Sequence, residues 1–214
     1  MLSDMGAIYT LGVSPGTRIR YNLIHDVWSR TYGGWGIYPD EGSSFILIEN
    51  NLVYRTKTGG FHQHYGQENI VRNNIFSFGH EHQFGRTRIE YHDSFIFEKN
   101  LVYFTEGDVW TGSWTENRAI VRNNLYFDPG RKKLVFGGMT IKQWQARGLD
   151  IDSMIVDPKF VNPAKGDFRL KKNSPAFKLG FVEFDLSTVG PRPQLTTHHE
   201  TRADSRTIDK LGRK

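Results

Sequence analysis

The chain has 214 residues, of which 37% are hydrophobic, and it contains no cysteine, which excludes disulfide bonds, thiol catalysis and cysteine-ligated metals. The net charge of +5 comes from 28 basic and 23 acidic residues scattered along the chain, so no basic block indicates a nucleic-acid partner. No apolar stretch is long enough to span a bilayer, no membrane partner is expected, and the composition predicts one elongated domain.

A short phrase recurs five times in the first two thirds of the chain. Its central residue is always asparagine, and successive copies are separated by 29, 23, 26 and 24 residues. A repeat of this period indicates one supersecondary unit stacked on copies of itself. β-Branched or aromatic residues lie three positions before and two positions after each asparagine, which predicts short strands on both sides. The five central residues are Asn22, Asn51, Asn74, Asn100 and Asn124.

The recurrent asparagine distinguishes this pattern from other repeats of similar length. Neither the spaced leucines of a leucine-rich repeat nor a helical period of 3.6 residues is present. At the tight corner of a right-handed parallel β-helix, asparagine tolerates the left-handed backbone conformation, and its amide can bond the asparagine of the next coil. We therefore predict an all-β, right-handed parallel β-helix, a single-stranded solenoid of five to six coils over residues 1–180, in which these asparagines are structural.

The N-terminal residues enter the coil pattern directly. Residues 1–9 show no basic start and apolar stretch of a signal peptide, and no polar segment that would cap a first coil. We therefore expect the chain to be the C-terminal part of a longer solenoid, or its first coil to be covered by a partner. An uncapped end would expose strand edges and favour self-association.

Chemically reactive side chains gather in the first coils. Counted back from each coil's asparagine, Gly6, Gly36 and Gly60 fall at nearly equal positions, so their strands should be neighbours in one sheet. Polar groups from successive coils would then share one face of that sheet, which a β-helix uses as a groove. The residues concerned are Asp4, Tyr9, Asp40, Glu41, His62, His64, Tyr65, His80 and His82.

Paired carboxylates beside aromatic rings suit the cleavage of glycosidic bonds. One carboxylic acid protonates the leaving oxygen while the other acts as base or nucleophile, and flanking rings stack on sugar faces. Asp4 and Asp40 are the candidate pair, although a lone aspartate near glycine is most often a turn residue. The candidate rings for sugar subsites are Trp35, Tyr38, Trp110 and Trp114, each of which could instead plug a coil.

Two histidine pairs, His62 with His64 and His80 with His82, each place two imidazoles on one side of a strand. Brought together with a carboxylate, they could bind zinc. The favoured interpretation is that these histidines, with Tyr65, hydrogen-bond sugar hydroxyls or tune an aspartate, and structural polar packing is the third. We predict no metal and no cofactor.

The repeat ends after Asn124. Residues 128–130 interrupt it, and residues 140–148 predict a short helix with a threonine N-cap and a glycine stop. Residues 157–176 resemble the closing segment of many secreted bacterial β-helix proteins, which packs as a last partial coil. We expect an irregular C-terminal segment and then a polar, basic, mobile tail over residues 181–214.

Three motifs, residues 4–9, 34–44 and 59–66, resemble the core motifs of bacterial right-handed β-helix proteins related to glycoside hydrolase family 141. That family includes fucosidase and xylanase activities on plant cell-wall glycans, and its proposed catalytic pair is two aspartates on adjacent coils. The resemblance covers residues 1–180 and implies Asp4 and Asp40 as the pair, with further coils upstream. It also implies a secreted or periplasmic parent protein, a location that the chain itself leaves open.

Two other functions remain open beside hydrolysis of plant cell-wall or related polysaccharides. A polysaccharide lyase on this fold would need a base and a basic cluster, for which His62, Tyr65, Arg86 and Arg88 could serve, but no dense aspartate cluster for calcium is evident. A non-catalytic glycan-binding or structural β-helix, including an inactive fragment, would need neither.

Overall fold

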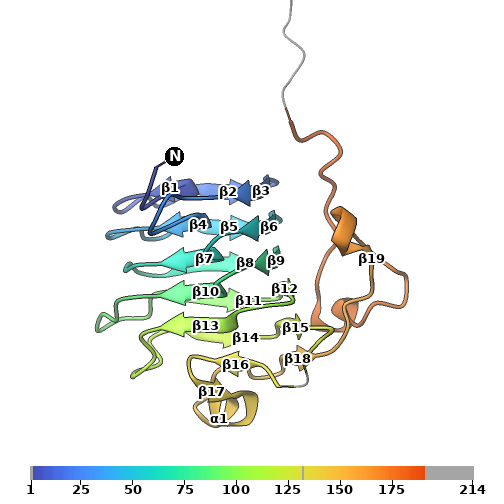
Figure 1. Cartoon of the computed structure of the whole chain (residues 1–214). Coiled ribbons are helices and arrows are strands. Elements are labelled where there is room, and N and C mark those ends of the chain that lie inside the picture. The colour runs from blue at the N-terminus through green and yellow to red at the C-terminus, as the bar shows by residue number, and fades with distance from the viewer. Residues whose placement is uncertain (1, 132, 191–214) are drawn as a thin grey trace, which may run out of the picture.

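Three parallel β-sheets wind around one axis in the computed structural model, which describes residues 2–131 and 133–190 (Figure 1). Each coil contributes one short strand to every sheet, and successive coils stack to form a parallel β-solenoid of about six turns. The predicted fold class is confirmed. Within the described ranges, no helix is long and apolar enough to cross a membrane.

Each sheet runs the length of the solenoid. Sheet A contains, in order, β1 (Gly6–Thr10), β4 (Trp35–Pro39), β7 (Gly59–Gln63), β10 (His82–Arg86), β13 (Asp108–Gly112), β16 (Val135–Phe136) and β17 (Met139–Thr140). Sheet B contains β2 (Arg18–Arg20), β5 (Leu47–Glu49), β8 (Asn69–Arg72), β11 (Phe95–Glu98) and β14 (Ile120–Arg122). Sheet C contains β3 (Leu23–Val27), β6 (Leu52–Thr56), β9 (Ile75–Gly79), β12 (Leu101–Tyr103), β15 (Leu125–Phe127) and β18 (Met154–Ile155).

The recurrent asparagines form a hydrogen-bonded ladder at the corner between sheets B and C. The side-chain amide of each donates to the Oδ1 atom of the next, at 2.8, 2.9, 3.0 and 3.3 Å from Asn22 to Asn124. The same Oδ1 atoms also accept the backbone N–H of the preceding asparagine. The predicted ladder is confirmed, with one correction. The left-handed backbone belongs to the residue before each asparagine, which is Tyr21, Asn50, Asn73, Lys99 or Asn123.

The apolar columns that flank the asparagines fill the interior of the solenoid. From sheet A, Ile37, Phe61, Phe84, Trp110 and Phe136 point inward in register and are fully buried. Sheets B and C add their β-branched and aromatic residues to the same core. The apolar core keeps water away from the short strands. Their backbone N–H and C=O groups are paired instead with the strands of the coils above and below.

The far end of the solenoid is closed by α1 (Ile141–Ala146). Thr140 caps this helix in a capping box with Gln143, which confirms the predicted threonine N-cap. Trp144 lies on the buried side of α1 and donates its indole N–H to Asp150 at 2.8 Å. Asp150 also accepts from Asn124, so the asparagine ladder ends on a buried carboxyl group.

The C-terminal segment departs from the predicted partial coil. It contains β19 (Phe160–Asn162), the 3-10 turn η1 (Pro163–Lys165), β20 (Asp167–Leu170) and the 3-10 turn η2 (Pro175–Leu179). β19 and β20 pair antiparallel, and the segment packs against the outer face of sheet C, beside β6, β9 and β12 (Figure 1). Phe181, Phe184 and Leu186 join this second apolar cluster, so the packed part extends beyond residue 180. Residues 191–214 of the predicted tail lie outside the described residues.

Candidate functional site

The outer face of sheet A carries most of the predicted site residues. Tyr9 pairs in register with Tyr38, and His62 pairs with Gly85, so their side chains follow one column down the solenoid. A second column contains Trp35 beside Gly59, and His82 beside Asp108. The predicted alignment of the glycine-containing strands is therefore confirmed for sheet A, although Gly6 faces Trp35 and lies one residue out of register.

Aromatic rings from three coils form a continuous layer on this face. The Trp35 and His62 rings are stacked with centroids 4.4 Å apart, and Tyr38 meets His62 edge-on at 4.8 Å. Tyr9 meets Tyr38 at 4.9 Å, and Tyr32 meets Trp35 at 4.9 Å. Trp35, Tyr38 and His62 are buried, whereas Tyr9 is 41% exposed and Tyr32 is 55% exposed. Only Tyr9 and Tyr32 of this layer offer their rings to a ligand.

Glycines make room for the buried rings. A Cβ atom on Gly85 would lie 2.6 Å from Nδ1 of His62 and 3.3 Å from Nε2 of His82. Both distances are closer than ordinary van der Waals contact, so only glycine lets the two imidazoles lie over this strand. The sequence Gly59-Gly60 and the single Gly85 thus determine where the rings of neighbouring coils settle.

Asp40 lies at the centre of the tyrosines. It follows β4 directly, and its backbone N–H donates to the Thr10 carbonyl at 2.9 Å. The hydroxyl of Tyr9 donates to Oδ2 of Asp40, and the ring of Tyr38 meets that of Tyr9 beside this carboxylate. The hydrogen bond to Asp40 is the main cause that raises the pKa of Tyr9, whereas burial is the main cause for Tyr38. Both phenols therefore stay protonated, and Tyr9 holds the carboxylate, which is 7% exposed.

Asp4 reaches the same tyrosines from the segment ahead of β1. Its backbone has a φ of 51°, and its N–H donates to the Tyr32 carbonyl. The close approach depends on Gly33, where a Cβ atom would lie 2.7 Å from the Met5 backbone nitrogen and where φ is +99°. Burial is the main cause that raises the pKa of Tyr32, and the charges of Asp4 and Asp40 raise it further, as they do for Tyr9 and Tyr38. Glu41 is exposed and adds a smaller effect on Tyr9 alone.

The histidines divide into a buried and a peripheral set. Burial lowers the pKa of His62 to about 3, with further lowering by His82 and His64, and burial lowers the pKa of His82 to about 4. Nδ1 of His62 and Nε2 of His82 are buried without a hydrogen-bond partner among the described residues. His64 bonds Thr87 at 2.7 Å. His80 lies elsewhere, with its Nδ1 atom 2.5 Å from Glu106.

The alternative zinc site is not assembled. His80 does not join the other histidines, and the described ranges contain no group of three or more histidine, cysteine, aspartate or glutamate side chains placed to hold a metal. Tyr65 lies at the edge of the face, stacked by Arg88 at 4.4 Å and beside His64 at 5.1 Å.

Besides Trp35, Tyr38 and His62, three further residues that were predicted or alternative ligand contacts are buried. Trp110 and Trp114 lie in the interior core, so neither forms a sugar subsite. Arg86 is fully buried, and its guanidinium donates to the carbonyls of Ser113, Glu116 and Asn117 while stacking on Trp114 at 3.9 Å. The strand pattern did contain the signal for Arg86, because Arg86 lies two residues after the buried Phe84 and period-two alternation places both side chains on the interior side.

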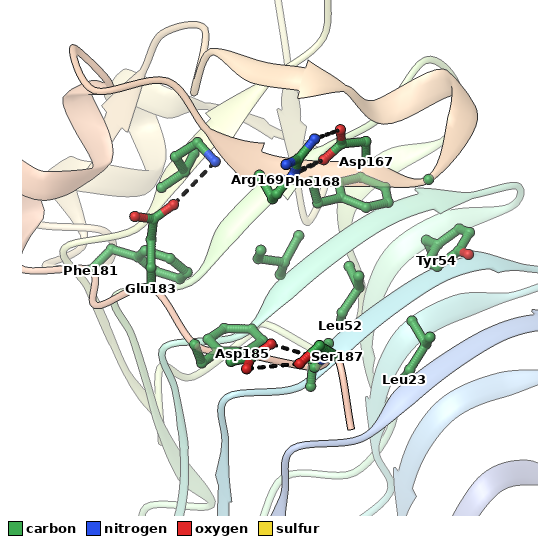
Figure 2. Close-up of a pocket in the computed structure, with 15 residues that line it drawn as sticks. Leu23, Leu52, Tyr54, Asp167, Phe168, Arg169, Phe181, Glu183, Asp185 and Ser187 are labelled. Atoms are coloured by element: carbon green, nitrogen blue, oxygen red, sulfur yellow. Dashed lines mark hydrogen bonds and ion pairs between the residues drawn. The ribbon is translucent and has the colours of Figure 1, made fainter. Parts of the chain in front are cut away.

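A separate cavity lies outside sheet C, beneath the C-terminal segment (Figure 2). It has a volume of about 370 Å³ and is lined mainly by apolar side chains, among them Leu52 and Phe168. Its charged groups already have partners: Asp167 pairs with Arg169, Glu183 accepts the Leu170 N–H, and Asp185 accepts from Ser187. Sequence reasoning missed this cavity, and the apolar residues 181, 184 and 186 were the only signal for it.

Comparisons with known proteins identify no family for this chain. No family model, no curated protein and no solved structure matches the chain. The chain is thus a parallel β-solenoid. The outer face of sheet A carries a layer of aromatic rings, and two carboxylates flank its strands.

Proposed function

We propose that this β-solenoid is a glycoside hydrolase that cleaves plant cell-wall or related polysaccharides with Asp4 and Asp40. The observation that carries the proposal is that Asp40 accepts from the Tyr9 hydroxyl and Asp4 is hydrogen-bonded to the Tyr32 backbone, so both aspartates lie beside tyrosines that expose their rings. Two carboxylates beside rings that can stack on sugar faces are what hydrolysis of a glycosidic bond requires. The resemblance of residues 4–9, 34–44 and 59–66 to glycoside hydrolase family 141 supports the same pair.

The two aspartates take different roles in this proposal. Asp40 is fixed by the hydrogen bond from Tyr9, which orients it as the base or nucleophile. Asp4 is exposed in the segment ahead of β1, where it is open to the leaving oxygen as the acid. Tyr9 and Tyr32 form the sugar platform, with Glu41, His64 and Tyr65 at its edge. Trp35, Tyr38, His62 and His82 support the platform from below.

A lyase is a weaker candidate at this site. Elimination needs a base that is already deprotonated and can take up the substrate's proton. The pKa of Tyr9 and that of Tyr38 are both raised, so their hydroxyls stay protonated. Arg86 is enclosed in the interior and cannot neutralise a uronate, and His62 is buried. Arg88 and Tyr65 are the remaining basic and phenolic groups on this side.

The test is hydrolysis of a panel of plant cell-wall polysaccharides, measured as new reducing ends. Asp4→Asn and Asp40→Asn should each abolish turnover, because an amide cannot act as acid, base or nucleophile. Asp152→Asn is the matched control for Asp4→Asn, since Asp152 is also exposed and has a φ of 59°, which asparagine tolerates. The control should retain activity, and all three variants should unfold at nearly the same temperature.

Three results would count against the proposal. Unimpaired hydrolysis by Asp40→Asn would remove that residue from the mechanism. Products that absorb in the ultraviolet as unsaturated uronides would indicate elimination and therefore a lyase. Binding of a glycan to the wild-type chain without cleavage, measured by calorimetry, would indicate a binding module.

A further inference from the structure

The first coil forms the open edge of all three sheets. β1, β2 and β3 are the terminal strands of sheets A, B and C, and each pairs with a neighbour on one side only. We propose that this edge docks a further parallel β-coil that presents an acidic residue two positions before a corner asparagine. The proposal is independent of the glycan site, and it rests on three kinds of complementarity at the edge.

The asparagine ladder has an unused acceptor at this end. The Oδ1 atoms of Asn51, Asn74, Asn100 and Asn124 each accept a backbone N–H and a side-chain amide from the coil above. Asn22 donates its amide to Asn51 and to the Arg20 carbonyl, but among the described residues no donor reaches its own Oδ1 atom. Another asparagine at the same corner would supply both missing donors.

Charges alternate beside the ladder. Arg20, Glu49, Arg72, Glu98 and Arg122 follow one another in register across sheet B. Arg72 pairs with Glu49 at 2.9 Å, and Arg122 pairs with Glu98 at 2.9 Å. Arg20 therefore begins the column without a carboxylate among the described residues, because Glu49 is taken by Arg72. The next residue in the alternation is acidic, and it would select the register of the docking coil more than it would add affinity.

Apolar surface accompanies these polar groups. Ile8 is only partly buried, whereas Ile37 and Phe61, which occupy the same column in the next two coils, are fully buried. Leu11 and Val13, in the turn after β1, are 61% and 68% exposed. A coil stacked on this edge would complete the burial of Ile8 and extend the interior core.

The base of a second copy of this chain cannot supply such a coil. α1 covers that end (Figure 1), and the ladder stops there on Asp150 and Ser153, which present no asparagine amide. The partner is therefore the end of a different parallel solenoid segment, with the pattern acid, any residue, asparagine. Glu49 and Asn51, or Glu98 and Asn100, show this pattern inside the present chain.

The experiment adds one such coil to the full chain. A copy of residues 28–58, which carries the copies of Glu49 and Asn51, is fused directly ahead of Met1. The connection from the copied β6 to β1 is then as long as that between β3 and β4. Amide hydrogen exchange is then measured over residues 6–27. Exchange in β1, β2 and β3 should slow by about tenfold or more, because these amides gain a paired neighbour. The matched control fusion carries Glu49→Arg and Asn51→Ala in the copied coil and should give little protection.

A charge exchange separates docking from unspecific covering. Arg20→Glu in the chain should weaken protection by the original fusion, and Glu49→Arg in the copied coil should then restore it. The proposal would be overturned if the two fusions protected the amides of residues 6–27 equally, or if neither fusion protected them. So would light scattering that finds the unfused chain as a stable dimer with β1, β2 and β3 already protected, since a second copy would then be the occupant.

Discussion

The hydroxyl group of Tyr9 donates a hydrogen bond to Oδ2 of Asp40, across two neighbouring coils. The orientation of Asp40 therefore depends on β1 in the first coil as well as on β4, which precedes it in the chain. Because β1 lies at the open edge of sheet A, any coil that docks there would also steady the tyrosine that holds this carboxylate.

Asn74→Ala should destabilise the fold by about 2–4 kcal/mol, because it leaves buried donors and acceptors on two neighbouring coils without partners. Asn74 accepts from Asn51 and donates to Asn100 and to the Ile48 carbonyl. Asn123→Gly is the control, since it removes an amide from the same corner at a left-handed φ of 52° that glycine tolerates. Urea unfolding of both variants measures the difference, and equal losses would contradict a special role of the ladder.

Gly85→Ala should cost about 1–3 kcal/mol through overpacking, because the new methyl group would meet Nδ1 of His62 at 2.6 Å. The imidazole must move, which disturbs its stack on Trp35. Gly130→Ala serves as the control because its Cβ atom would meet nothing closer than 3.4 Å. Thermal unfolding compares the two variants, and a neutral Gly85→Ala would show that the ring layer adapts without cost.

Stability should fall as the pH drops below about 6.5, the ordinary pKa of histidine. His62 and His82 have folded-state pKa values lowered to about 3 and about 4, so only the unfolded chain takes up their protons between those values and 6.5. The contribution is fully present above pH 6.5 and is lost as the pH falls through this window, by about 1.4 kcal/mol per pH unit for each proton.

Urea unfolding between pH 7 and pH 4.5 measures this slope. His62→Gln removes one of the two titrating groups and should reduce the slope by about half. His82→Gln should reduce the slope in the same way, because burial also lowers the pKa of His82. An unchanged slope in His62→Gln would show that its neutral form is not required by the fold.

Phe168→Ala should loosen the C-terminal segment and cost about 3–5 kcal/mol. The ring packs against Tyr54 and Phe160, with centroids 5.2 Å away in each case, and it lines the cavity beneath the segment (Figure 2). Phe177→Ala is the control, since Phe177 is 40% exposed. Limited proteolysis should cut residues 157–187 faster in Phe168→Ala alone, and equal cleavage of both variants would contradict the docking role.

The repeat was predictable because its signal is redundant. Five asparagines with apolar residues at fixed offsets indicate stacking whatever any single coil does, and the ladder follows from their geometry. The left-handed residue of each corner was predicted one position too late, at the ladder asparagine. Both members of pairs such as Asn73-Asn74 tolerate left-handed geometry, and only packing decides between them.

The candidate site was predictable in outline but not in exposure. Register brings Tyr9, Tyr38 and His62 onto one column, and the glycine positions predict that register to within one residue at β1. The burial of Trp35 depends on Tyr32 and on a ring stack with His62, which are contacts between loops and coils that no local pattern encodes. The inward direction of Arg86 follows from its place two residues after Phe84, whereas the three carbonyls that accept from its guanidinium lie in a later loop.

Asn73 and Val182 exchange two hydrogen bonds, of 2.7 and 2.8 Å, across 109 positions of the chain. In a simple solenoid each coil contacts only its neighbours, so the end coils can fray while the middle stays folded. Here the segment that leaves the last coil is fastened to the third, so opening the base also requires releasing the middle of the molecule. The coils from the third to the base should therefore open together, in one cooperative step.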